Sequence, residues 1–235
     1  MPRVARQLVD GGIYHLINRG NGQQRVFHKD RDFQAFTDLL AEMCCRYAVE
    51  VLAWCLMSNH YHLVVRPQFG ADLSRGMQWF QTTHVRRYHR HYGSSGHLWQ
   101  GRYKSYLVAD DDQLLTVVRY VEANPVRANM VDSAAGWLWS SHHQRSRLQG
   151  TGSAGACPCE QQLEVEGTGS AGACPSQWIP AGACPSEKYV AACPSTKVQL
   201  APLPIGLPQN WTEYVDTPLT DKELARVRMK RAGLA

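Results

Sequence analysis

The sequence predicts an α+β fold, a ferredoxin-like split βαβ domain with a mostly antiparallel sheet and helices on one face. Three observations support this prediction. Some segments alternate apolar and polar residues as half-buried strands do, and others repeat apolar residues at the three-and-four spacing of amphipathic helices. These segments follow the order strand, helix, strand, strand, helix, strand, helix. With 235 residues and 44% hydrophobic content, the chain can bury one ordinary core.

The first part of the predicted domain contains three strands and one helix. Residues 13–18 alternate apolar and polar side chains and are followed by a glycine-rich turn, which is typical of a strand. A helix is predicted over 31–47, with Asp30 available as its cap. The β-rich runs 49–57 and 61–65 are separated by only three residues, so they predict a hairpin.

The second part of the predicted domain supplies two more helices and the last strand. A helix is predicted over about 72–91 and a strand over 103–108. The acidic run 110–112 is suited to cap a further amphipathic helix. Asn124-Pro125 should end that helix, because the residue before proline is pushed out of helical geometry.

Charge is distributed unevenly along the chain. Residues 1–150 contain 18 Lys and Arg against 12 Asp and Glu, whereas residues 151–235 contain 7 against 8. A basic region rich in histidine favours a polyanionic partner, because clustered cations release counterions from phosphate. The N-terminus lacks the apolar core of a signal peptide, and the longest apolar run, 51–57, is too short to span a bilayer. We therefore expect a cytoplasmic protein with no membrane partner.

A repeated segment interrupts the chain after the predicted domain. The sequence GTGSAGACP begins at Gly150 and again at Gly167, and shortened copies follow. Such small residues bury too little apolar area to offset the entropy of ordering, so we expect disorder here and interpret the copies as an insertion at the DNA level. The predicted organisation is a domain over 1–147, a disordered repeat segment over 148–200, and a C-terminal extension with a short basic helix over 201–235.

The first candidate site residues are His60 and His62. Alternate residues of a strand point to the same face, so both imidazoles would converge on one site, and imidazole nitrogen binds several divalent metals. Two unrelated histidines, satisfied within the fold or at the surface, are the alternative.

The second candidate pair is Tyr120 and Asn124, which lie four residues apart and so share one helical face. An asparagine oxygen is a hard ligand that could complete a site held by two histidines. If the helix packs over the central strands, it brings Tyr120 to that metal. The alternative is that Tyr120 is an amphipathic core residue and Asn124 only a helix stop.

Cations alternate with aromatic rings in residues 84–92 and again in residues 99–104. Arg and Lys neutralise phosphates, while Tyr and His rings offer faces on which unpaired bases stack. The two segments together predict a groove for single-stranded nucleic acid. A solvated basic helix face is the alternative for the first.

Four motifs together resemble the single-tyrosine HUH transposases, and more narrowly the REP-associated tyrosine transposases. They are MSNHYHLVV at 57–65, LWQGRY at 98–103, Tyr120, and Asn124-Pro125. The resemblance extends from Gly11 to His143, and LPQNWTEYV at 207–215 also resembles that subfamily. The chain departs from it in two ways. The repeats interrupt the join, and a Gly-Arg-Pro-Phe-Gly-like ending is absent after Lys230-Arg231.

This resemblance implies a transposase that nicks and rejoins single-stranded or hairpin DNA at palindromic repeats through a 5′-phosphotyrosine intermediate. Tyr120 would be the nucleophile, and His60, His62 and Asn124 would hold Mg²⁺ or Mn²⁺. Because a phenol has a pKa of about 10, the metal and nearby cations would be needed to favour its oxyanion. The expected DNA-contacting residues are Arg86, Arg87, Tyr88, Arg90, Trp99, Arg102 and Lys104.

Two other functions remain open at this point. One is a non-cleaving DNA-binding regulator derived from such a transposase, and the other is a hydrolytic His-x-His metalloenzyme acting on a small molecule. The basic aromatic segments disfavour the second. The sequence leaves both a monomer and a homodimer open.

Overall fold

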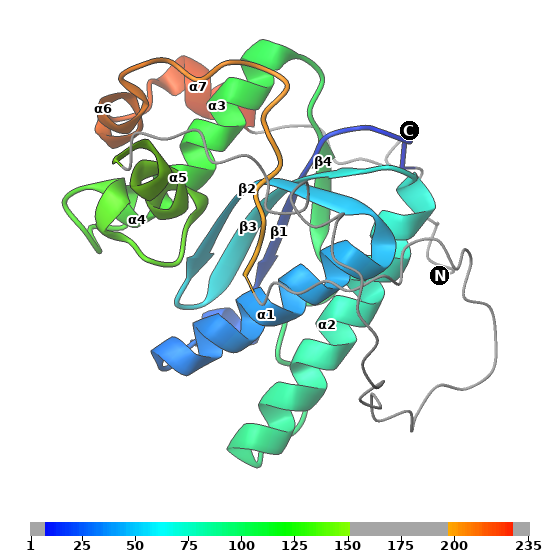
Figure 1. The fold of residues 1–235 in the computed structure, drawn as a ribbon. Coiled ribbons are helices and arrows are strands. Elements are labelled where there is room, and N and C mark those ends of the chain that lie inside the picture. Colours follow the sequence, from blue (N-terminus) through cyan, green and yellow to red (C-terminus); the bar gives the residue numbers. More distant parts are fainter. Residues whose placement is uncertain (1–7, 151–196, 228–235) are drawn as a thin grey trace, which may run out of the picture.

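The computed structural model describes residues 8–150 and 197–227 of the chain. Its centre is a four-stranded sheet in the order β2-β3-β1-β4, and every neighbouring pair of strands is antiparallel (Figure 1). The strands are β1 (Tyr14–Arg19), β2 (Val49–Met57), β3 (His60–Pro67) and β4 (Lys104–Leu107). The predicted α+β, ferredoxin-like fold is confirmed.

The helices fall into a longer and a shorter group. The longer ones are α1 (Asp30–Tyr47), α2 (Gly70–Tyr92), α3 (Asp111–Glu122) and α5 (Ser141–Gly150). The shorter ones are α4 (Asn124–Arg127), α6 (Trp211–Asp216), α7 (Asp221–Val227) and the 3-10 turns η1 (Asn21–Gln23) and η2 (Ala134–Gly136).

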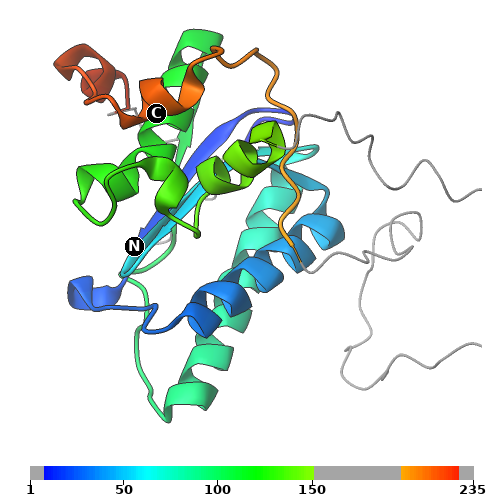
Figure 2. The same ribbon diagram turned by 60° about the vertical axis from the view of Figure 1, so that its left-hand side comes forward.

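Helices cover both faces of the sheet, so the expectation of helices on one face was wrong. Helices α1 and α2 pack on one face, where they enclose a core that includes Leu16, Phe36 and Leu63. Helix α3 packs on the other face against a second core that includes Val64 and Val117 (Figure 2). Alternate residues of each strand point to opposite faces of the sheet, so both faces can carry apolar side chains. The apolar stripe of α3 is buried against the second of these faces.

Local sequence explains some element ends and not others. Asp110 caps α3 by accepting a hydrogen bond from the backbone of Gln113 at 2.7 Å, as the acidic run predicts. In contrast, Asp30 is the first residue of α1 and not its cap. The N-cap is Lys29, whose backbone N–H donates to Asp32 at 3.1 Å. Helix α3 ends at Glu122 with Ala123 as its C-cap, close to where Asn124-Pro125 was expected to end it. A separate short helix, α4, then begins at Asn124 with Pro125 in its first turn.

Most of the C-terminal segment 197–227, from Ala201 onward, belongs to the same core as α3. Its Trp211 and Val215 are each 1% exposed and contribute to the core that contains Val117. Leu200 also pairs in parallel with Val51 of β2. The segment that follows the repeats in sequence is therefore an integral layer of the domain, and it covers α3.

The predicted boundaries of the repeat segment shift inward at both ends. Helix α5 continues to Gly150, and Val198 is 4% exposed in the first core. The predicted disorder of the repeats lies outside the described residues. Within 8–150 and 197–227, no helix is long and apolar enough to cross a membrane.

Candidate active site

His60 and His62 both project from β3 toward the face that α3 covers. They alternate along the strand with Tyr61 and Leu63, whose side chains enter the core beneath α1 and α2. Both imidazoles line a cavity of about 450 Å³, which Tyr120 and Asn124 line from the other side. The four residues singled out from the sequence therefore meet at one cavity.

His60 is held by its neighbour in the hairpin turn. The Nδ1 of His60 lies 2.7 Å from the side-chain oxygen of Asn59, and the Asn59 amide nitrogen donates to the backbone oxygen of Gln23 at 3.0 Å. Because an amide oxygen only accepts, the His60 Nδ1 must donate to it. The lone pair of His60 consequently resides on Nε2.

His62 has a histidine as its partner. Its Nδ1 lies 3.0 Å from Nε2 of His15 on β1, and the two rings stack with centroids 5.2 Å apart. His15 is completely buried, whereas His62 is 4% exposed. His15 was not predicted as a site residue, although it occupies the same alternating strand face as Ile17 and Arg19, which line the cavity.

Burial keeps these three imidazoles neutral near pH 7. It lowers the pKa of His15 to about 3. Burial, followed by the charge of Arg19, lowers the pKa of His60 to about 4. Burial, followed by the neighbouring His15, lowers the pKa of His62 well below its ordinary value. Neutral imidazole is the form that binds metals, so the pair is ready to act as ligands without first losing a proton.

Tyr120 lies edge-on to His62, with ring centroids 5.7 Å apart. The guanidinium carbon of Arg127 lies 4.6 Å from the centre of the Tyr120 ring. Arg127 also lines the cavity, together with Arg19 and Lys104. Three cations therefore surround the phenol and the histidines, which suits an anionic ligand.

Asn124 lies one helical turn after Tyr120 and is 8% exposed. Its amide nitrogen donates to the backbone oxygen of Tyr120 at 2.8 Å. The atom left to bind a ligand in the cavity is therefore its carbonyl oxygen. Within the described residues, no cluster of three or more His, Cys, Asp and Glu side chains is arranged to hold a metal.

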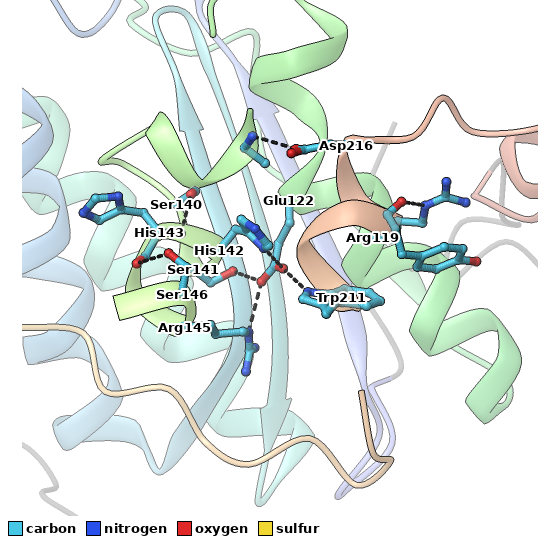
Figure 3. A network of polar contacts seen from close by, with 12 residues as sticks. Arg119, Glu122, Ser140, Ser141, His142, His143, Arg145, Ser146, Trp211 and Asp216 are labelled. Atoms are coloured by element: carbon cyan, nitrogen blue, oxygen red, sulfur yellow. Dashed lines mark hydrogen bonds and ion pairs between the residues drawn. The ribbon is translucent and has the colours of Figure 1, made fainter. Parts of the chain in front are cut away.

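Buried charges on α3 flank Tyr120 and fix this helix in place (Figure 3). Glu122 is completely buried and accepts hydrogen bonds from Ser141 at 2.5 Å, His142 at 3.1 Å, Arg145 at 3.1 Å and Trp211 at 2.8 Å. Its burial alone would raise its pKa, but the partners, led by His142, hold the pKa below its ordinary value. Glu122 therefore remains a carboxylate and joins α3 to α5 and α6.

Arg119 makes the corresponding connection on the other side of Tyr120. It is 2% exposed and donates to the backbone oxygens of Tyr214 at 2.8 Å and Thr217 at 3.0 Å. It also forms an ion pair with Glu223 of α7. Buried polar groups are costly unless they are fully hydrogen-bonded. Both Arg119 and Glu122 therefore require the C-terminal segment to be docked.

The expected DNA-contacting residues are only partly brought to the cavity. Lys104 lines the cavity. Arg102, two residues earlier in the chain, is exposed but does not line it. Arg86, Arg87, Tyr88 and Arg90 lie on α2, across the sheet from the histidines. The side chain of Arg87 is half exposed and lies 3.7 Å from Glu42 in a surface ion pair.

Trp99 must be removed from the set of expected stacking residues. It is 6% exposed and packs within the first core, where its ring centroid lies 5.3 Å from that of Tyr61. A base could stack on it only after the core had opened. The sequence motif containing Trp99 therefore supplies core packing at this position.

Two cations lining the cavity, Arg19 and Arg127, were not predicted. Arg127 follows Asn124 by three residues, a spacing that places both on one helical face, so the sequence contained a usable signal. Arg19 is the last residue of β1, opposite His60 in the register of the sheet. Only the pairing of the two strands reveals that proximity.

Comparison with known proteins shows which class of protein this chain resembles. Residues 9–124 match the family model described as "Transposase IS200 like". The chain is similar to this family of transposases, and the resemblance noted in the sequence is confirmed.

Within this class, the chain is similar to the REP-associated tyrosine transposases. A Haemophilus influenzae protein (strain ATCC 51907 / DSM 11121 / KW20 / Rd) named for that group is 25% identical over 162 residues, which cover 61% of this chain and 87% of the relative. A solved structure of a REP-associated tyrosine transposase bound to a REP hairpin has a TM-score of 0.51 and 17% identity. That match covers 63% of this chain and 86% of the other, and it is a likeness of fold.

Proposed function

We propose that this chain is a metal-dependent, single-strand DNA endonuclease and strand-transferase, with Tyr120 as its nucleophile. The observation that carries the proposal is the convergence of His60, His62, Tyr120 and Asn124 on one cavity that is also lined by three cations. Such a cavity suits a phosphodiester, because the cations neutralise its charge while a phenol lies beside the metal-binding groups.

Mg²⁺ or Mn²⁺ is the proposed cofactor, and the donor set fits it. Two neutral imidazoles and one amide oxygen supply nitrogen and oxygen ligands, and the remaining positions would be left to water and to a phosphate oxygen. When bound, the cation would polarise the scissile phosphate and stabilise its developing negative charge. His60, His62 and Asn124 would hold it.

The proposed cleavage is a displacement at phosphorus. The hydroxyl oxygen of Tyr120 forms a bond to phosphorus and loses its proton to solvent, while the bond from phosphorus to the 3′-oxygen breaks and that oxygen takes up a proton. The products are a 5′-phosphotyrosine on the protein and a free 3′-hydroxyl. Because the phosphodiester energy is retained, attack by another 3′-hydroxyl reverses the step and joins a new strand.

Single-stranded or hairpin DNA is the proposed substrate. A hairpin substrate is supported by the protein of similar fold, whose structure was solved with a bound REP hairpin. Arg19, Lys104 and Arg127 would contact the phosphates next to the cleaved bond. The exposed cations Arg86, Arg87, Arg90 and Arg102, together with Tyr88, would contact DNA farther along the strand.

A non-cleaving DNA-binding regulator is the alternative that the basic surface also permits. A covalent protein–oligonucleotide adduct, resolved on a denaturing gel after incubation with hairpin DNA and Mg²⁺ or Mn²⁺, separates the two. Our proposal expects an adduct that requires the metal. Tight DNA binding without any adduct would favour the regulator, and neither binding nor adduct would favour an enzyme acting on small molecules.

A further inference from the structure

The hydrogen bond between His15 and His62 depends on which ring nitrogen of each histidine carries the hydrogen. A neutral imidazole carries one hydrogen on its two nitrogens, so the nitrogen that donates and the nitrogen that holds the lone pair are linked. The His62 Nδ1 and the His15 Nε2 are 3.0 Å apart, and both rings are buried. One of these two nitrogens must donate and the other must accept.

The neighbouring His60 shows the arrangement that a ligand requires. Its Nδ1 donates to the Asn59 side-chain oxygen at 2.7 Å, which leaves the lone pair on Nε2. Metal-binding histidines in general use one ring nitrogen for the metal and donate the other N–H to a fixed acceptor. Asn59 is the acceptor for His60. Among the described residues, the partner at the Nδ1 of His62 is the Nε2 of His15.

We propose that His15 is the positioning residue of His62. It accepts the hydrogen of His62 Nδ1 and thereby directs the Nε2 lone pair of His62 into the cavity. This inference rests on the proposed function, in which His62 is a metal ligand. It assigns to a buried residue of β1 the same task that Asn59 performs for His60.

The position of His15 fits a supporting role and not a ligand role. His15 is completely buried and does not line the cavity, whereas His62 does. In the register of the sheet His15 lies opposite Val64 and is therefore diagonal to His62, close enough for the rings to stack. The sheet itself fixes the spacing of the two rings.

The arrangement also fixes the hydrogen of His15. If its Nε2 accepts from His62, its own hydrogen resides on Nδ1, and that atom is buried without a hydrogen-bond partner among the described residues. An unpaired buried N–H is unfavourable, so the reverse arrangement competes while the cavity holds no cation. A cation on Nε2 of His62 excludes the reverse arrangement, because that nitrogen can no longer carry a hydrogen.

The test is to determine both tautomers in the full chain by long-range ¹H–¹⁵N correlation of the histidine rings, with Mg²⁺ added. Mg²⁺ is diamagnetic and leaves the signals sharp. We expect His62 to carry its hydrogen on Nδ1 and His15 to carry its hydrogen on Nδ1 as well. A His62 ring that responds to Mg²⁺ while its hydrogen stays on Nε2, or Mg²⁺ coordination by His15, would overturn the proposal.

A pair of variants gives a second readout. His15→Phe keeps a ring of similar size but removes the acceptor, so we expect Mn²⁺ alone to bind about 10- to 100-fold more weakly. His15→Gln retains an acceptor at a similar reach and should recover most of that affinity. Equal affinity of Mn²⁺ for His15→Phe and the unmodified chain, with both proteins folded by circular dichroism, would also overturn the proposal.

These outcomes separate the role of His15 from the metal site itself. If neither His60 nor His62 responds to Mg²⁺ or Mn²⁺, the metal site of the proposed function fails, and the role of His15 fails with it. If both rings respond but the affinity is indifferent to His15, only the role of His15 fails.

Discussion

Tyr120 contributes one atom to the proposed reaction, its hydroxyl oxygen. We predict that Tyr120→Phe abolishes the covalent adduct and leaves binding of a hairpin oligonucleotide nearly unchanged, because the ring and its contacts with His62 and Arg127 are retained. The measurement is adduct yield on a denaturing gel beside affinity from fluorescence anisotropy.

A matched control for this variant is Tyr106→Phe. Tyr106 is half-buried beside His15, with ring centroids 6.2 Å apart, but it does not line the cavity. Its loss should leave the adduct in place. An adduct of normal yield in Tyr120→Phe would contradict the assignment, and Tyr88, Tyr92, Tyr103 and Tyr106 would then be tested as nucleophiles.

The three proposed ligands should differ in their importance. We predict that His60→Ala or His62→Ala abolishes cleavage and greatly weakens Mn²⁺ binding, because each removes a direct nitrogen ligand. Asn124→Ala should be milder, since water can replace a neutral oxygen ligand. Isothermal titration with Mn²⁺ measures the effect, and unchanged affinity in the His60→Ala, His62→Ala double variant would place the metal elsewhere.

Short spacings made these residues predictable, and long-range pairing did not. His60 with His62, and Tyr120 with Asn124, are each related by the period of their own element, so the sequence alone indicates a shared face. His15 and Arg19 join the site through the register of β1 against β3, which no local pattern contains. Trp99 was misassigned because its basic neighbours suggested a surface, whereas its ring fills the core.

At the scale of elements, α3 depends on a segment that is remote in sequence. Arg119 and Glu122, on either side of Tyr120, are buried and satisfied by α5, α6 and α7. The described C-terminal segment thus supports the helix that presents Tyr120, although the repeats separate the two in sequence.

This dependence predicts opposite results for two deletions. Replacing residues 151–196 by a flexible Gly/Ser linker should leave folding and cleavage essentially unchanged, because closure entropy grows slowly with loop length. Val198 must be kept, since it is 4% exposed in the core. Removing 197–235 should instead destabilise the protein severely. Arg119 would lose Thr217 and Glu122 would lose Trp211, which leaves two buried charges with fewer hydrogen-bond partners.

Thermal unfolding and adduct yield measured on both variants test this pair of predictions. A folded but inactive protein lacking 151–196 would show that the repeats have a role in cleavage. A protein lacking 197–235 that is as stable as the full chain would show that the C-terminal segment is dispensable for α3.

The elements themselves were largely predictable, but their layering was not. The hairpin of β2 and β3 and the cap of α3 follow from local patterns, and β2 begins and ends where the sequence indicates. Which face each helix covers is decided by tertiary packing. The pattern of apolar residues in α3 is compatible with packing on either face of the sheet. Its packing against Trp211 could not be predicted from spacing in the sequence.

At the scale of the whole molecule, the partly buried carboxylate of Glu223 should make stability depend on acid. The pKa of Glu223 falls from 4.5 to about 2; burial opposes this fall, but hydrogen bonds from Thr220, Tyr214 and Arg119 outweigh it. A depressed folded-state pKa contributes stability that is present above the unfolded value and is lost as pH falls through the folded value. We therefore predict that stability declines as the pH is lowered from about 4.5 toward about 2.

Denaturant unfolding across this pH window provides the check, with Glu223→Gln as the variant. The variant should be less stable than the unmodified chain near pH 7, and the difference should shrink as pH falls through the window. Glu42→Gln is a suitable control, because Glu42 pairs with Arg46 at the surface, where ion pairs contribute little. A difference between Glu223→Gln and the unmodified chain that does not vary with pH would contradict the prediction.

The central claim is that the hydroxyl of Tyr120 becomes joined to DNA at the cavity formed by His60, His62 and Asn124. The most direct measurement is to trap the adduct with hairpin DNA and Mn²⁺, digest it with a protease and a nuclease, and locate the modified residue by tandem mass spectrometry. Our account predicts a 5′-phosphotyrosine on Tyr120. A nucleotide on any other residue, or cleaved DNA with no covalent protein product, would contradict it.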